Sequence, residues 1–409
     1  MSDAQQTPRH GRLRQSHASL FILRIVAIGA ACVLVASASV AAVALGSLSQ
    51  EVTANAVDIS NGTEPAAPPP QIGSIPGGFN VLIVGSDNDK DQGDAFGERD
   101  ADLNDVNILL HVSEDQRNAV VVSFPRDLVI PHPECTDPET GETFDAMSAR
   151  PLNDALERGG LGCVTATISQ LTGLDIPYAG LVSFNGVIAM SDAVGGVPVC
   201  LEEPIADPYS GLDLPAGTSV ISGTQALAFL RSRHGVGDGG DLSRISSQQS
   251  YLSSLMRKIR SEDTLTDIGK LYGLARAATQ NIKLSTSLAS LDSMVSMALA
   301  LKDVDLDKLV FVQYPTLTDP DDANRLVPDS DLAAQLFGQI SADQPFTLGA
   351  DAMGPGATAA PGDPAAPAPV ETTAPDAPST DAPPAPPTAI DGIKGQTAAE
   401  QTCAIAFSE

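Results

Sequence analysis

The sequence predicts an α/β protein whose folded part is a three-layer α/β/α sandwich around a central mixed sheet. Short apolar runs typical of buried strands alternate with longer segments of helical spacing, and Gly, Pro, Asn and Asp stand between them. The chain has 409 residues, of which 43% are hydrophobic, so it is long enough to bury such a core.

Each strand is predicted where a short β-branched run ends at a turn-forming residue. The predicted strands are 79–85, 106–112, 119–124, 178–184 and 309–314, and a further one follows the VGGVP turn at 194–198. Helices are predicted from apolar residues three and four apart, and the first of them ends at Thr172-Gly173. The predicted helices are 152–171, a short one before residue 194, 222–230, 242–259, 264–280 and 285–301.

An uncharged apolar run at residues 25–48 follows four arginines, which indicates a single-pass signal anchor with its N-terminus in the cytoplasm. A cleavable signal peptide is the alternative, because alanines in this run resemble a cleavage site. The run is longer than the roughly 7–15 residues of a cleavable apolar core. We therefore expect a basic cytoplasmic segment at 1–24, an anchor at 25–48 and everything after it outside the cell.

Composition divides the exported part. Residues 49–77 are expected to form a Pro-rich stalk, and residues 347–387 a disordered linker rich in Pro and Ala. The predicted folded domain is 78–346, and a short C-terminal tail covers 388–409.

The net charge of −28, with 23 Lys and Arg against 51 Asp and Glu, argues against binding to nucleic acid. Because positive charge is scarce, any clustering of arginines is informative.

Four cysteines lie in the exported part, and they can pair in three ways. None has the spacing of a zinc site, so we expect disulfides, with Cys135 bonded to Cys163 and Cys200 to Cys403. Buried free thiols are the alternative.

Two acidic positions stand at neighbouring strand ends. Asp87 follows the first strand, and Asp105 opens the second. Such residues commonly form turns and caps. The alternative is that Asp87 and Asp105 together hold a hard divalent cation, Mg²⁺ or Mn²⁺, bound to a phosphate.

The segment Ser-Phe-Pro-Arg-Asp at 123–127 ends a strand, because proline keeps Phe124 extended and removes an N–H group. Arg126 is therefore expected at the strand tip, where it either pairs with an acid such as Asp127 or binds a ligand.

The segment 231–249, RSRHGVGDGGDLSRISSQQ, combines arginines with a Gly-rich loop. Arg231 and Arg233 share a face if the helix gives way there to extended chain, and Asp241 is expected to cap the next helix. Arg244 falls in the first helical turn, where the helix macrodipole disfavours a cation. An anion bound between the helix N-terminus and the Arg244 guanidinium would explain this placement. Gln248 lies one turn further on the same face. The alternative is ordinary salt bridging.

Arginines that converge near two carboxylates would bind phosphate bidentately. Together with Mg²⁺ they would supply the positioning and the charge neutralisation that phosphoryl transfer requires. The sequence has no nucleotide-binding P-loop.

These segments, in this order, resemble the LytR-CpsA-Psr family of membrane-anchored cell-wall ligases. The matching stretches are NVLIVGSD (80–87), NDVNILLHV (104–112), VVSFPRD (121–127), LNDALERGG (152–160), LTGLDIPY (171–178), AVGGVPV (193–199) and the segment 223–249. The resemblance implies transfer of a phosphoglycan from a polyprenyl-(pyro)phosphate carrier to peptidoglycan, with Mg²⁺ on the pyrophosphate.

The resemblance also implies residue roles. Asp87 and Asp105 match the metal-binding carboxylates, and Gln248 matches the accompanying glutamine. The pyrophosphate-binding arginines match Arg126, Arg231, Arg233 and Arg244. Asp105 and Asp127 are the two candidates for the residue that accepts the proton of the attacking hydroxyl.

The sequence departs from the family pattern at three places. Leu103 stands where the family often has Arg, with Arg99 nearby. Arg150 and Arg158 are the candidates for a basic residue before the LNDA-like asparagine, and Ser247 replaces a frequent second Arg.

The carrier's lipid tail needs an apolar groove, for which helices at 164–171, 186–194 and 285–300 are candidates. Two other functions remain open: a non-catalytic binder of polyprenyl phosphate or wall glycan, and a membrane-bound transcriptional attenuator. Residues 1–24 show no DNA-binding feature that supports the latter.

Overall fold

The structure, a computed structural model, describes residues 56–59, 77–88, 102–138, 140–261, 274, 277–361 and 387–407. The predicted cytoplasmic segment (1–24), the membrane anchor (25–48), and most of the stalk and linker lie outside these residues. No helix in the described part of the chain has both the length and the apolarity needed to cross a membrane.

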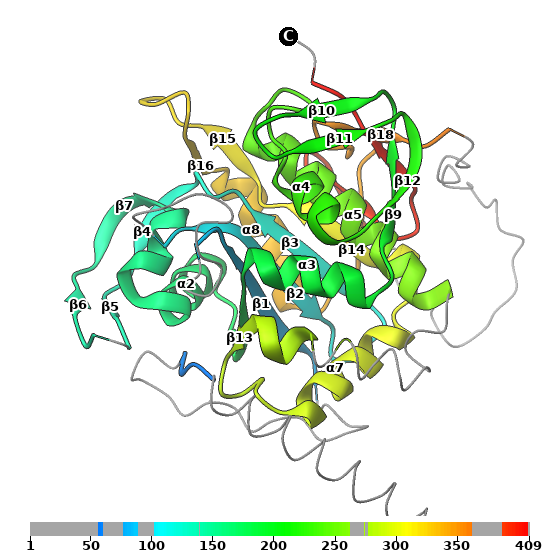
Figure 1. Cartoon of the computed structure of the whole chain (residues 1–409). Helices are drawn as coiled ribbons and strands as arrows, with labels where there is room; N and C mark the ends of the chain where they lie inside the picture. Colours follow the sequence, from blue (N-terminus) through cyan, green and yellow to red (C-terminus); the bar gives the residue numbers. More distant parts are fainter. Residues whose placement is uncertain are drawn as a thin grey trace, which may run out of the picture. The chain divides into compact units, whose positions relative to one another are not determined.

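A seven-stranded mixed sheet forms the centre of the fold (Figure 1). In spatial order its strands are β13 (Ile282–Leu284), β8 (Tyr178–Val182), β1 (Phe79–Ser86), β2 (Asn104–Val112), β3 (Ala119–Phe124), β14 (Leu309–Gln313) and β20 (Gly395–Thr397). The pairs β1–β8 and β3–β14 are parallel, and the other pairs are antiparallel. The predicted mixed sheet is therefore confirmed.

Helices cover both faces of this sheet, because each strand alternates the direction of its apolar side chains. Leu82 and Val84 of β1 join a cluster with α2 (Ala155–Thr172) and α8 (Ser330–Ser341). Phe79 and Val81 point to the other face, toward α7 (Leu291–Asp303) and α5 (Asp241–Ser261). This arrangement is the expected three-layer sandwich.

A second, smaller core packs on the other side of α5. It contains a four-stranded sheet in the order β12 (Gly217–Ile221), β9 (Val197–Leu201), β21 (Thr402–Ala404) and β18 (Ala357–Ala359). The hairpin of β10 (Ile205–Asp207) and β11 (Leu212–Leu214) joins it, together with α4 (Gly223–Arg231).

Short elements complete the described fold. They are α3 (Phe184–Ala193), the 3₁₀ turns η2 (Leu152–Asp154) and η3 (Leu306–Lys308), and the strand pairs β4 (Val129–His132) with β7 (Met147–Pro151), β5 (Cys135–Thr136) with β6 (Thr143–Phe144), β15 (Thr316–Thr318) with β16 (Leu326–Pro328), and β17 (Phe346–Leu348) with β19 (Thr388–Ile390).

The composition predicts that the folded domain ends at residue 346, but the structure shows that it continues beyond this residue. β20 pairs with β14 at the edge of the central sheet, and β21 inserts between β9 and β18. Residues 347–361 belong to the segment predicted as a disordered linker, and they include the end of β17 and all of β18. The reason is that short apolar pieces such as Ile390, Ile393 and Ala404 complete cores formed by distant strands, which local composition does not reveal.

Two other expectations differ in detail. The helix predicted at 285–301 starts at Leu291, because Ser285 forms a β-bridge with Val57 of the expected stalk. Most of the helix predicted at 264–280 lies outside the described residues, and residues 277–280 are helical.

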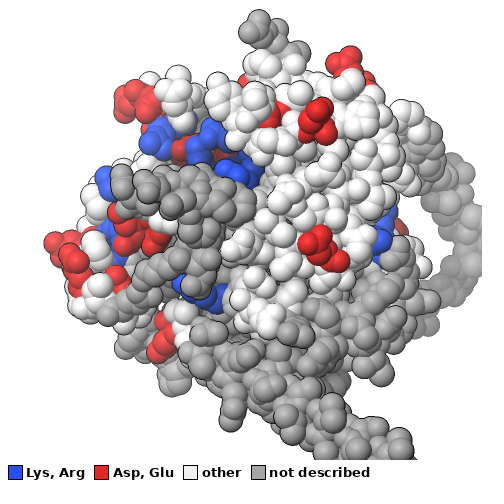
Figure 2. Space-filling model, in the orientation of Figure 1, with Lys and Arg blue, Asp and Glu red and all other residues white. Residues whose placement is uncertain are grey.

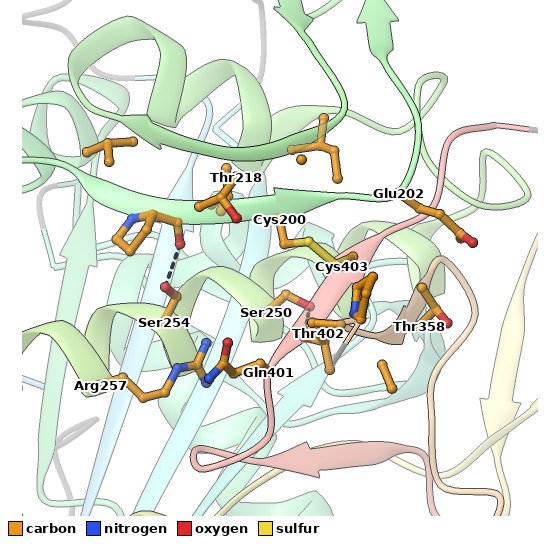
Figure 3. A pocket seen from close by; sticks show the side chains of 18 of the residues that line it. Cys200, Glu202, Thr218, Ser250, Ser254, Arg257, Thr358, Gln401, Thr402 and Cys403 are labelled. Carbon is orange, nitrogen blue, oxygen red and sulfur yellow. Dashed lines mark hydrogen bonds between the residues drawn. A yellow bond between two sulfur atoms is a disulfide. The ribbon is translucent and has the colours of Figure 1, made fainter. Parts of the chain in front are cut away.

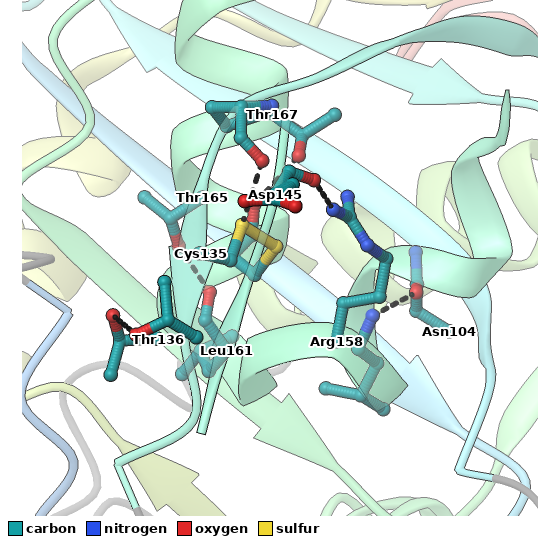
Figure 4. Close-up of a disulfide and its surroundings, with 12 residues drawn as sticks. Asn104, Cys135, Thr136, Asp145, Arg158, Leu161, Thr165 and Thr167 are labelled. Atoms are coloured by element: carbon teal, nitrogen blue, oxygen red, sulfur yellow. Dashed lines mark hydrogen bonds between the residues drawn. A yellow bond between two sulfur atoms is a disulfide. The ribbon is translucent and has the colours of Figure 1, made fainter. Parts of the chain in front are cut away.

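Both expected disulfides are present. Cys135 and Cys163 have their Cα atoms 5.4 Å apart, and the Cα atoms of Cys200 and Cys403 are 4.4 Å apart. The first bond lies against a kink in α2 (Figure 4). A Cβ atom at Gly159 would lie 2.9 Å from Cys135 Cβ, so glycine is needed for this close approach.

We predict that loss of the second disulfide destabilises the fold more than loss of the first. Cys200–Cys403 closes a span of 203 residues and Cys135–Cys163 one of 28, so the longer loop restricts the unfolded chain more. Chemical denaturation should show that Cys200→Ser/Cys403→Ser lowers the free energy of unfolding by about 1–2 kcal/mol more than Cys135→Ser/Cys163→Ser. Equal losses for the two double variants would contradict this.

Candidate functional site

The site forms where β3 ends. Pro125 stops the strand, and the next residue is held through its backbone: Arg126 N–H donates to Asp241 Oδ2 at 3.1 Å, and its carbonyl accepts from Asn153 N at 3.0 Å. The turn is thereby fastened both to the start of α5 and to the LNDA-like segment. Arg126 stands at the strand tip, as the sequence predicted.

The Arg126 side chain contacts two of the predicted acids. Its Nη1 donates to Asp105 Oδ1 at 2.7 Å, and its Nε to Asp127 Oδ2 at 3.4 Å. Burial alone would lower the pKa of Arg126, but Asp105, Asp127 and Asp241 outweigh it and raise that pKa. Arg126 is thus a permanent cation shared between carboxylates.

Arg244 lies in the first turn of α5, where a cation opposes the helix dipole. Asp241 supplies the compensating charge, with its Oδ1 2.5 Å from Arg244 Nη2, and the same nitrogen donates to the carbonyl of Asp105 at 2.7 Å. No capping bond from Asp241 to its own helix is seen among the described contacts. Asp241 instead accepts from the backbone N–H of Arg126, in the turn after β3, and pairs with the side chain of Arg244 in its own first helical turn.

Two further arginines reach this cluster. Arg325 Nη1 pairs with Asp127 Oδ1 at 2.7 Å. Burial and the nearby charges of Arg126 and Arg244 lower the pKa of Arg233, which places its guanidinium among the others. We call Arg126, Arg233, Arg244 and Arg325, with Asp105, Asp127 and Asp241, the arginine cluster.

The arginine cluster has one positive charge in excess, since four guanidinium groups share three carboxylates. Arg233 Nε and Arg244 Nε are buried and have no acceptor among the described residues. Figure 2 shows Lys and Arg atoms gathered at the upper left, with acidic atoms among them. The cluster can therefore accept an anion that brings several oxygen atoms.

Arg231 and Gln248 each make a contact with a neighbouring element. The Arg231 guanidinium carbon lies 4.2 Å from the centre of the Phe184 ring on α3. Ser232, between Arg231 and Arg233, is extended, so the helix gives way there as expected. Gln248 Nε2 donates to the Leu230 carbonyl at 2.9 Å and so joins α5 to the end of α4.

The two acids proposed as metal ligands stand on paired strands. Ser86 pairs with Asn104, and the register shifts at Gly85/Ser86, so Asp87 and Asp105 flank the same end of β1 and β2. Asp87 is 3% exposed. Among the described residues, no group of three or more His, Cys, Asp or Glu side chains is arranged to hold a metal ion.

The candidate basic residues near the LNDA-like segment have local partners. Arg150 pairs with Asp154 at 3.0 Å. Arg158 is buried and donates to the carbonyl of Asp145, beside the first disulfide (Figure 4). Arg99 lies outside the described residues. Ser247 is fully buried and donates to the Ser243 carbonyl, so an arginine would not fit there without repacking.

A cavity of about 750 Å³ lies between α5 and the four-stranded sheet, beside Cys200–Cys403 (Figure 3). Polar side chains line much of it, Ser250, Ser254 and Arg257 from the helix and Gln401 and Thr402 from the C-terminal segment. The residues that line this cavity do not come from 164–171, 186–194 or 285–300, the ranges considered for a lipid groove.

The C-terminal segment supports the Gly-rich loop between Arg233 and Arg244. Val236 forms a β-bridge with Ala406, Gly237 N donates to the Ile405 carbonyl at 3.0 Å, and Phe407 N donates to the Gly235 carbonyl at 3.0 Å. Cys403 attaches this segment to β9. The loop that carries the arginines is thus held by the last residues of the described chain.

Sequence reasoning missed two members of the arginine cluster. Arg325 follows three acids in the β15–β16 connection, so it reads as a surface residue paired locally. Asp241 was recognised only as a cap. A scarce arginine at the start of an apolar strand was the available signal for Arg325.

The model of the LytR_cpsA_psr family matches residues 41–339. The cell wall biosynthesis protein LcpA of Corynebacterium glutamicum is 30% identical over 264 residues, which cover 58% of this chain and 50% of that protein. The polyisoprenyl-teichoic acid–peptidoglycan teichoic acid transferase TagT of Bacillus subtilis is 24% identical over 242 residues, covering 58% and 69%. This chain therefore spans about half the length of LcpA.

Among solved structures, protein gbs0355 of Streptococcus agalactiae superimposes with a TM-score of 0.53 and 22% identity, over 65% of this chain and 88% of that one. This likeness supports the α/β fold.

Acid sensitivity is predicted from His132 on β4, which is 1% exposed. Burial, and then the charge of Arg158, lowers its pKa from 6.5 to about 4. The unfolded chain therefore binds the extra proton first, so stability is complete above pH 6.5 and falls between pH 6.5 and 4, by up to about 3 kcal/mol.

Denaturation measured at several pH values checks this. His132→Gln should flatten the slope between pH 6.5 and 4, whereas His234→Gln, which changes an exposed histidine, should leave it intact. A wild-type stability that does not change over this range would contradict the assignment.

Proposed function

Because this chain belongs to the LytR-CpsA-Psr family, we propose that it transfers a glycopolymer from a polyprenyl-(pyro)phosphate carrier to peptidoglycan, with the diphosphate bound in the arginine cluster. The wall-related names of its relatives, a cell wall biosynthesis protein and a teichoic acid transferase, support this class of substrate.

The observation that carries the proposal is the pair of buried N–H groups, Arg233 Nε and Arg244 Nε, left without acceptors in a cluster of excess positive charge. A buried donor without a partner costs roughly 1–3 kcal/mol. A diphosphate offers several anionic oxygens at the spacing that guanidinium forks bind best. Binding of such a ligand removes both the unsatisfied donors and the repulsion among the arginines.

In the proposed reaction, a peptidoglycan hydroxyl attacks the phosphorus that bears the glycan. A new P–O bond forms to the acceptor, the P–O bond to the bridging oxygen breaks, and polyprenyl phosphate leaves with that oxygen. The hydroxyl proton passes to Asp105 or Asp127, both of which contact Arg126. The guanidinium groups stabilise the charge that develops on the phosphoryl oxygens.

Two carboxylates at one strand end fit Mg²⁺, which is commonly bound by one or two carboxylates while water and phosphate complete its coordination. Asp87 and Asp105 would hold it, and Asp105 would then give up part of its contact with Arg126. When bound, the ion neutralises phosphate charge and orients the oxygens. Mn²⁺ has the same ligand preference.

We also propose that residues 25–48 anchor the protein in the cell membrane with the folded domain outside. The carrier lipid and the acceptor would then meet on the side where both disulfides are stable.

Arg126→Ala and Arg233→Ala are expected to reduce glycan transfer by about 100-fold or more, because each removes a donor that stabilises the transition state. Transfer is measured with the purified full chain in detergent, a polyprenyl-pyrophosphate glycan, Mg²⁺ and peptidoglycan. Arg117→Ala, which changes an exposed arginine outside the cluster, serves as the control. Full activity in the cluster variants would refute the proposal.

Metal dependence separates an enzyme from a non-catalytic binder. Chelation should abolish transfer, and Asp87→Asn should raise the Mg²⁺ concentration that half-maximal activity requires. Tight carrier binding by Asp87→Asn and Asp105→Asn, together with no transfer by the wild type, would instead favour the binder.

A further inference from the structure

We propose that Tyr209 and His234 form a saccharide-binding platform beside the arginine cluster, on which the first sugar of the diphosphate-linked glycan stacks. This inference rests on the function proposed above and names a contact for the donor glycan. Tyr209 stands in the turn between β10 and β11, and His234 follows Arg233 directly in the chain.

The two rings contact each other and remain open to solvent. Their centres are 4.7 Å apart with an angle of 51° between the planes. Tyr209 is 79% exposed, which is the highest exposed fraction among the exposed large hydrophobic residues of the described part. Burying such a ring against a ligand would be favourable, and contact with His234 already restricts its rotation.

A buried acid, Asp207, connects the platform to the residues around Arg233. Asp207, 1% exposed, accepts from Tyr209 N at 3.0 Å and from Ser232 Oγ at 2.7 Å. Ser232 immediately precedes Arg233. The hairpin tip and the arginine segment are therefore held together through one carboxylate, which keeps the platform at a fixed position relative to the diphosphate site.

A second exposed aromatic residue adjoins the same loop. Phe407 is 43% exposed, and a Cβ atom at Gly239 would lie 3.2 Å from its ring. The chain has no Trp and only 16 Tyr and Phe residues. Tyr209 and Phe407, the two aromatic residues among the exposed large hydrophobics of the described part, therefore both lie against residues 233–240. Exposed apolar side chains without a role are usually scattered singly over a surface.

A pyranose ring is the occupant that fits these groups and their location. One face of the ring presents C–H groups, which pack on the negative face of an aromatic ring, while its hydroxyl groups remain in water. The Cα atoms of Arg233 and His234 are about 3.8 Å apart as chain neighbours. A sugar joined directly to a diphosphate at Arg233 therefore lies within reach of the platform.

The experiment compares two probes, farnesyl pyrophosphate and farnesyl pyrophosphate carrying N-acetylglucosamine, on the full chain in detergent. Tyr209→Ala should weaken binding of the sugar-bearing probe by roughly three- to tenfold and leave the sugar-free probe unchanged. Tyr209→Phe should bind both as the wild type does, because the ring face remains. Val220→Ala, which removes another exposed apolar side chain, is the matched control.

The chain's lack of Trp gives an independent readout, because Tyr209→Trp introduces its only indole. Its fluorescence should change with the sugar-bearing probe and stay constant with the sugar-free one. If Tyr209→Ala affects both probes equally or neither, the platform is excluded. If Arg233→Ala fails to weaken the sugar-free probe, the diphosphate site itself is wrong, so the two failures are distinguishable.

Discussion

Repulsion among guanidinium groups is the constraint on which this structure depends. Arg126, Arg233, Arg244 and Arg325 come from distant parts of the chain, and bringing them together is unfavourable unless acids lie between them. Asp105, Asp127 and Asp241 serve this purpose, and each comes from a strand end, a turn or a helix start. The compensation is incomplete, since one charge and two buried N–H groups remain. This incomplete compensation is what makes the cluster suited to an anionic ligand.

The surrounding fold fixes these charges through the backbone. Asp241 holds the turn after β3, Gln248 holds the end of α4, and Asp207 holds the residue before Arg233. Residues 405–407 pair with the Gly-rich loop, and a disulfide attaches them to β9. A segment with the composition of a free tail therefore supports the site. It holds the Gly-rich loop that lies between Arg233 and Arg244.

Much of the local structure could be predicted because it depends on neighbouring residues. The strand ending at Phe124 follows from Pro125, and the placement of Arg244 in a first helical turn follows from the Gly-rich loop before it. The C-terminal strands could not be predicted, because a three-residue strand such as β21 is stabilised by its partners β9 and β18 and by Cys200, not by its own sequence.

By itself, the sequence determined the α/β class, the order of the main strands and helices and the identity of most cluster arginines, since these depend on residue type and short-range pattern. The disulfide pairing was one of three that the four cysteines allow, and the structure selected it. Only the tertiary structure decided which acid each arginine contacts, that Arg325 joins them, that Arg231 lies on Phe184, and that the chain's last described residues support the site. The physical reason is that pairings between charges depend on distances in space. Contacts between segments far apart in the chain, such as Arg325 with Asp127, set many of those distances, and no local pattern records them.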